Sequence, residues 1–238
     1  LEAARSEVAG LSDAVDAARP AAADARALTE IIGLRADDLS AEAIAAVTSA
    51  TATLTDLVGT PVTEPELPES IGTPGSLPER YVSAERGELE ALRRQVDVQV
   101  DRMAALGAAA AARVTELAEA RTALTRAVGA AVTAARAQAP ATLSAAGEAT
   151  TDARAAFEQA VAALDALGEN PTPDATTRQA FSTYFTAADA LRLSHEQAVA
   201  AREAAEQAAA EEAARRAEEE ARRNEQQGPW WWGWWDNQ

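Results

Sequence analysis

Apolar residues recur at three- and four-residue steps along most of this chain, the spacing that places them on one face of an α-helix. Residues 1–33 carry one such stripe and residues 41–58 carry another. Ser40 is in position to cap the second helix, and Gly59 is in position to end it. Pro20 is expected to kink or interrupt the first helix. Because runs of strand type are absent, the pattern predicts an all-α protein.

The clearest pattern is a heptad repeat that predicts one helix from about residue 82 to 138. Positions seven residues apart hold Leu89, Val96, Met103, Ala110, Leu117, Leu124 and Ala131. The companion positions hold Leu92, Val100, Leu106, Val114 and Val128. At about 1.5 Å per residue this helix is about 85 Å long, and its single register indicates coiled-coil-like packing.

Two further helices follow, separated by turn-forming residues. Pro140 is expected to end or sharply bend the long helix, and residues 141–168 then repeat the heptad pattern. Thr172 is expected to cap the fifth helix, with Pro173 at its first helical position. This helix begins with large apolar residues and then changes character near residue 200.

Residues 200–227 contain Ala as their only apolar residue. Their acidic and basic residues form i,i+4 pairs with Glu on the N-terminal side, namely Glu211–Arg215, Glu212–Arg216, Glu218–Arg222 and Glu219–Arg223. Each pair adds about 0.2–0.5 kcal/mol to an isolated helix. The segment is therefore predicted to be a solvated helix that needs no packing partner.

The helix lengths predict an elongated antiparallel bundle of two three-helix sections, placed end to end and sharing the long helix. The helices within 1–58 are expected to cover the first half of the long helix, about 82–110, and the solvated C-terminal helix is expected to protrude. The predicted organisation is an N-terminal helical pair at 1–58, a Pro-rich linker at 59–79, a bundle at 80–199, a charged Ala/Glu/Arg helix at 200–227 and a Trp-rich tail at 228–238.

Charge and composition exclude several classes of function. The formal net charge is −17, and all 21 basic residues are Arg. Such a surface repels nucleic-acid phosphates, so nucleic acid is not expected as a partner. No Cys is present, which excludes disulfides and thiolate chemistry.

His195 is the single histidine, so a catalytic triad or a histidine-rich metal site has little basis. Glu196 follows it, but the zinc-protease pattern requires a second His where this chain has Val199. We therefore expect His195 to be an ordinary helix residue. The sequence predicts no enzyme, no cofactor, no metal and no catalytic residue.

The aromatic residues give the sharpest functional signal, because all five Trp residues fall within the last nine positions. We expect them to bind a partner: Trp230, Trp231, Trp232, Trp234 and Trp235. Each indole can bury about 150–250 Å². The candidate targets are a membrane interface, a cell-wall polymer, a protein groove, or this chain's own bundle or a second copy of it.

Residues 39–58 contain Leu39, Ser40 and Ile44, leading to Leu54, Leu57 and Val58. In style this segment resembles the small three-helix surface modules called FIVAR-like, and the body resembles Ala-rich helical regions of secreted or envelope-anchored proteins from high-GC bacteria. The resemblance implies a spacer or adhesive stalk in an extracytoplasmic location, and it identifies no binding residue.

Residue 1 is Leu and not Met. We therefore also expect that a signal peptide or an anchor helix preceded it, or that the start of the sequence is artificial. The leading hypothesis is a non-enzymatic surface spacer with a docking Trp-rich tail. The alternative is a homo-oligomeric filament or bundle subunit, in which the tail packs into a neighbouring copy.

Overall fold

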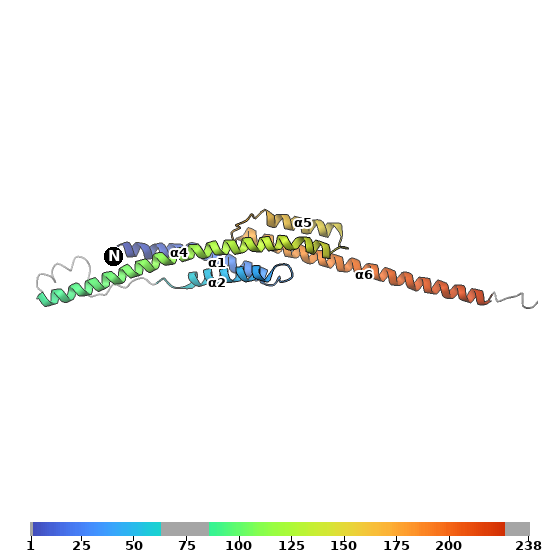
Figure 1. Cartoon of the computed structure of the whole chain (residues 1–238), viewed down its shortest axis with the longest axis horizontal. Helices are drawn as coiled ribbons and strands as arrows, with labels where there is room; N and C mark the ends of the chain where they lie inside the picture. Colours follow the sequence, from blue (N-terminus) through green and yellow to red (C-terminus); the bar gives the residue numbers. More distant parts are fainter. Residues whose placement is uncertain (1, 63–85, 227–238) are drawn as a thin grey trace, which may run out of the picture. The chain divides into compact units, whose positions relative to one another are not determined.

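The computed structural model describes residues 2–62 and 86–226. Within these ranges the regular elements are five α-helices and no strand occurs, so the protein is an all-α helical bundle, as predicted. The helices are α1 (Glu2–Gly33), α2 (Ala41–Gly59), α4 (Arg86–Ala145), α5 (Thr151–Asp165) and α6 (Ala175–Gln226) (Figure 1).

The chain divides into two compact units. The first unit comprises residues within 1–140 together with 160–185, and the second comprises residues within 141–159 and from 186 onward. α4, α5 and α6 therefore each contribute to both units. The end-to-end arrangement of two three-helix sections stays a prediction.

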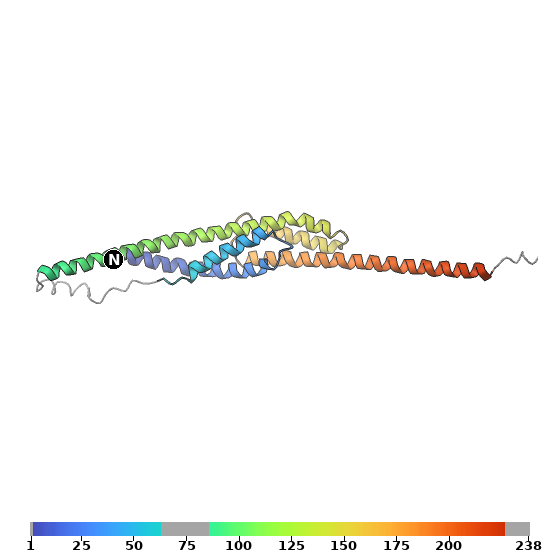
Figure 2. The same cartoon turned by 60° about the horizontal axis from the view of Figure 1, so that its bottom comes forward.

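Within the first unit, α1 and α4 lie side by side and run in the same direction (Figures 1 and 2). A Cβ added at Gly107 of α4 would lie 3.3 Å from the Cα of Ala4 near the start of α1, so the backbones approach closely where both residues are small. Further along, Pro20 of α1 shares a groove with Leu124 of α4. The inner face of α1 is buried through a heptad-like series: Ala4, Val8, Leu11, Val15, Ala18, Ala22 and Ala25.

α1 and α2 form a helical hairpin that is held by side-chain hydrogen bonds. Thr29 and Thr51 lie 2.9 Å apart through their hydroxyl oxygens, and Arg26 donates to Thr55 at 3.1 Å. Ser40 caps α2 as predicted, since its hydroxyl oxygen accepts from the backbone N–H of Ala43 at 3.2 Å. Gly59 is the last residue of α2, which also confirms the expected end.

Arg113 of α4 binds the carbonyl groups at the C-terminal end of α2. Its guanidinium donates to the carbonyl oxygens of Leu57 at 2.6 Å, Thr60 at 2.5 Å and Pro61 at 3.3 Å. The last carbonyls of a helix have no partner within the helix, so a cation at this place satisfies them and also favours the helix dipole.

The start of α6 supplies the aromatic part of the first unit's core. Phe181, Tyr184 and Phe185 are buried, and the Tyr184 hydroxyl donates to the carbonyl oxygen of Ala135 at 3.2 Å. The guanidinium carbon of Arg35 lies 5.2 Å from the ring centroid of Phe185, within the range of a cation–π interaction.

The second unit is built from the end of α4, the start of α5 and α6 beyond residue 185. Phe157 of α5 and Leu191 of α6 are fully buried there. Arg154 of α5 closes the C-terminal end of α4 by donating to the carbonyl oxygens of Leu143, Ala146 and Gly147 at 3.4, 3.0 and 3.2 Å.

Neither proline ends its helix, so that part of the two proline predictions was wrong. Pro20 does not interrupt α1, and Pro140 does not end α4, which continues to Ala145 before the chain turns into α5 at Thr151. Both prolines lie on exposed faces. The carbonyl that each proline leaves without a helical donor can therefore be hydrated, and the buried face of the helix stays intact.

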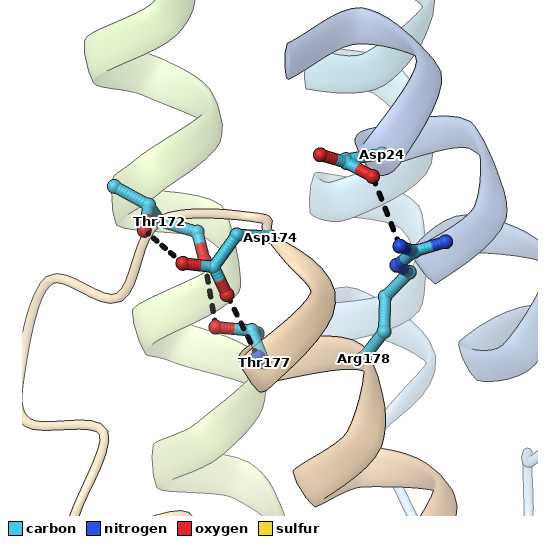
Figure 3. Close-up of polar contacts among 5 residues, drawn as sticks. All are labelled: Asp24, Thr172, Asp174, Thr177 and Arg178. Atoms are coloured by element: carbon cyan, nitrogen blue, oxygen red, sulfur yellow. Dashed lines mark hydrogen bonds and ion pairs between the residues drawn. The ribbon is translucent and has the colours of Figure 1, made fainter. Parts of the chain in front are cut away.

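The predicted cap of the fifth helix was also wrong, by two residues. α6 begins at Ala175, and its N-cap is Asp174 rather than Thr172. The Asp174 carboxylate accepts from the backbone N–H of Thr177 at 2.9 Å, while the Thr172 hydroxyl donates to the same carboxylate at 2.9 Å (Figure 3). Thr172 therefore supports the cap instead of forming it.

Candidate functional site

The five partner-binding residues predicted from the sequence lie outside the described residues. Residues 228–238, called here the Trp segment, contain Trp230, Trp231, Trp232, Trp234 and Trp235. The structure does describe the helix that leads to them, residues 200–226 of α6, called here the solvated helix.

Every residue of the solvated helix is exposed. One of the predicted i,i+4 pairs forms with good geometry, because Arg216 donates to Glu212 at 2.5 Å. At about 1.5 Å per residue the segment is about 40 Å long. The prediction of a helix at this place is confirmed, and its Ala and paired charges explain how it forms without burying a face.

A cluster of polar contacts fixes the root of the solvated helix in the second unit. Arg202 donates to the carboxylate of Glu148 at 3.2 Å, and its guanidinium lies 3.5 Å from Glu206. The Ser194 hydroxyl accepts from the backbone N–H of Thr150 at 3.0 Å. The hydrogen bond to Glu148 raises the pKa of Arg202 above its ordinary value.

His195 belongs to the same cluster. Its Nδ1 accepts from the backbone N–H of Glu148 at 3.2 Å, so the ring carries its proton on Nε2 in this contact. The residue thus closes the turn between α4 and α5. Among residues 2–62 and 86–226, no group of three His, Asp or Glu side chains is arranged to hold a metal ion.

A groove of about 240 Å³ lies in the first unit between α1, α4 and the segment that leads into α6. Both of its carboxylates take part in contacts that hold the fold together. Asp24 forms an ion pair with Arg178 at 3.1 Å, and Asp174 caps α6 (Figure 3). The hydrogen bond from the Thr177 backbone lowers the pKa of Asp174 below 3.8, which favours the ionised form that caps α6.

The exposure of the N-terminal part of α4 was not predicted from the sequence. Helices α1 and α2 were expected to cover the long helix from about residue 82, but no residue between Arg86 and Arg102 is fully buried. The described residues of α1 meet α4 with Ala4 against Gly107, which lies beyond this part of α4. The heptad position Met103 is 6% exposed, whereas Val100 is 51% exposed.

No family model, curated protein or solved structure matches this chain. Within the part of the chain that the structure describes, no helix is both long enough and apolar enough to cross a membrane. The function must therefore be inferred from the chain's own residues.

Proposed function

We propose that this chain is a non-enzymatic helical spacer of the cell surface, whose Trp segment docks to a membrane interface. The main support is the solvated helix, which is exposed at every residue and directly precedes the Trp segment. A helix that buries nothing within its own chain contributes length rather than packing. In this proposal the solvated helix serves as a spacer between Arg202, near its start, and the Trp residues.

A membrane interface is the target that suits clustered indoles best. The ring is apolar and the N–H is polar, and both are satisfied at the headgroup level. Trp230, Trp231 and Trp232 are consecutive, and Trp234 and Trp235 follow one glycine later, so several rings can insert together. With a net charge of −17 the protein should prefer zwitterionic lipid to anionic lipid.

The extracytoplasmic location is part of the same proposal. It is supported by the resemblance of residues 39–58 to FIVAR-like surface modules and by the Ala-rich body. A wall polymer or a protein groove would use the same indoles by stacking or burial, and these targets are the alternatives that the experiment must separate.

The test is tryptophan fluorescence, because every indole of the chain belongs to the Trp segment. With phosphatidylcholine vesicles we expect the emission maximum to shift to the blue and acrylamide quenching to fall. A chain that ends at residue 227 should lose vesicle co-sedimentation and keep its helicity. A blue shift with wall polysaccharide alone would replace the membrane by a polymer. A protected spectrum in buffer that dilution does not change would contradict the spacer role.

A second candidate is a homo-oligomeric assembly in which the Trp segment of one copy packs on the next. It is favoured by the groove of about 240 Å³, whose apolar wall includes Ala17, Ala21 and Leu124. This candidate predicts that the chain ending at residue 227 loses its self-association in sedimentation. The membrane proposal predicts no such dependence.

A further inference from the structure

The groove of about 240 Å³ in the first unit has apolar walls and the size of a single side chain. Ala17, Pro20 and Ala21 of α1 line it together with Leu124 of α4 and Pro173. Pockets that hold drug-sized ligands have volumes of about 300–1,000 Å³, so this groove suits one ring system rather than a length of peptide.

The polar groups of the groove are those that an indole can use. Arg121 lines it and forms no hydrogen bond or ion pair among the described residues. A guanidinium of this kind interacts favourably with the face of a Trp ring. Asp24 also lines the groove and binds Arg178 through Oδ1, which leaves Oδ2 to accept from an indole N–H (Figure 3).

The chain supplies five indoles within residues 230–235, but one copy cannot bring them back to its own groove. α6 is a continuous helix of 52 residues, so about 78 Å separate Gln226 from the start of α6 beside the groove. Trp235 follows Gln226 by nine positions, which span at most about 32 Å. The indole that reaches this groove must therefore come from another copy.

We infer that the groove at Ala21 and Arg121 of one copy holds a Trp side chain from the Trp segment of a second copy. The groove and the Trp segment are different surfaces, so the contact is heterologous. The inference gives the homo-oligomeric candidate a site and rests on that candidate. It does not depend on docking to a membrane.

The site is tested by filling the groove. Light scattering coupled to gel filtration should show a mass that rises with concentration from 24.8 kDa, at an ionic strength of about 0.15 M that screens the like charge of two copies. Ala21→Gln occupies the groove without lowering helix propensity much, and should weaken the association at least tenfold. Ala14→Gln is the matched control, because Ala14 is half-buried one heptad earlier on α1 and does not line the groove. Circular dichroism should show equal helicity for both variants.

Arg121→Gln tests the contact between the guanidinium and the ring. We expect it to weaken the association about two- to fivefold, the size of an exposed cation–π interaction. Arg102→Gln removes the same charge from an exposed position of α4 outside the groove, and should have no such effect.

A mixing experiment tests that the contact is heterologous. A chain in which all five Trp residues are replaced by Ser keeps its groove, and Ala21→Gln keeps its Trp segment. Each variant should stay monomeric alone, and the two should form a one-to-one complex when mixed. All Trp emission in the mixture comes from Ala21→Gln, so its shift to the blue reports the docking directly.

Four outcomes would overturn the inference. They are a strict monomer at all concentrations, association that Ala21→Gln leaves intact, no complex in the mixture, and a monomer whose Trp emission is already blue and protected. Failure of the membrane proposal is seen separately, because Ala21→Gln should bind phosphatidylcholine vesicles as well as the wild type does. A wild type that self-associates and ignores vesicles would contradict membrane docking and leave the groove contact in place.

Discussion

At the scale of single residues, the start of α6 depends on one carboxylate. Asp174→Ala removes the acceptor for the Thr177 backbone N–H, and we expect it to lower the free energy of unfolding by about 1 kcal/mol. Asp174→Asn retains a cap and should lose much less. Asp13→Ala, at an exposed position inside α1, is the control and should change stability little. Urea denaturation measures all three.

The same carboxylate predicts a pH dependence with a definite sign. The pKa of Asp174 is lowered in the folded protein, so its stabilisation is fully present above the unfolded value of 3.8. As the pH falls below 3.8 and through the lower folded pKa, the difference in stability between the wild type and Asp174→Ala should shrink. A difference that grows on acidification would contradict this assignment.

Two glycines inside helices should respond oppositely to the same substitution. A Cβ at Gly129 would lie 2.2 Å from the carbonyl oxygen of Glu169, so Gly129→Ala must displace backbone and should destabilise by about 1–3 kcal/mol. Gly10 has open space around its Cα, and Gly10→Ala should stabilise by about 0.5–1 kcal/mol through helix propensity. Equal shifts in thermal midpoint would show that the close contact at Gly129 does not form.

At the scale of helices, the solvated helix should unfold without affecting the rest. Ala208→Pro breaks a helix whose side chains are all exposed, so we expect a partial loss of helical circular dichroism and no change in the urea midpoint of the remaining protein. Ala188→Pro strikes a fully buried position of the same helix and should lower that midpoint strongly. A cooperative loss on Ala208→Pro would mean that the solvated helix packs after all.

The helices could be predicted wherever apolar residues recur at helical spacing, because these residues form the buried face of each helix. Leu117 and Leu124 are buried as the heptad requires, and Ser40 caps α2 as its side chain allows. Pro140 misled the prediction, since its effect depends on whether it faces solvent, which the local sequence does not state. Thr172 misled it because Asp174, two residues later, competes for the same backbone donor.

The candidate site was predictable only in part, for a similar reason. A helix of Ala and Glu–Arg pairs has no large apolar residue to bury and is stabilised by its own ion pairs. The exposure of residues 200–226 therefore follows from local composition. The partial exposure of Leu89 and Val96 does not, because it depends on the offset between α1 and α4. That offset is set by the contact between Ala4 and Gly107, which no heptad pattern reveals.

At the scale of the whole molecule, the membrane proposal separates the role of the indoles from that of the solvated helix. Ala208→Pro breaks the solvated helix and leaves all five Trp residues in the chain. The blue shift at saturating phosphatidylcholine should therefore equal that of the wild type. A blue shift that is lost in Ala208→Pro would show that docking requires the intact solvated helix as well as the Trp segment.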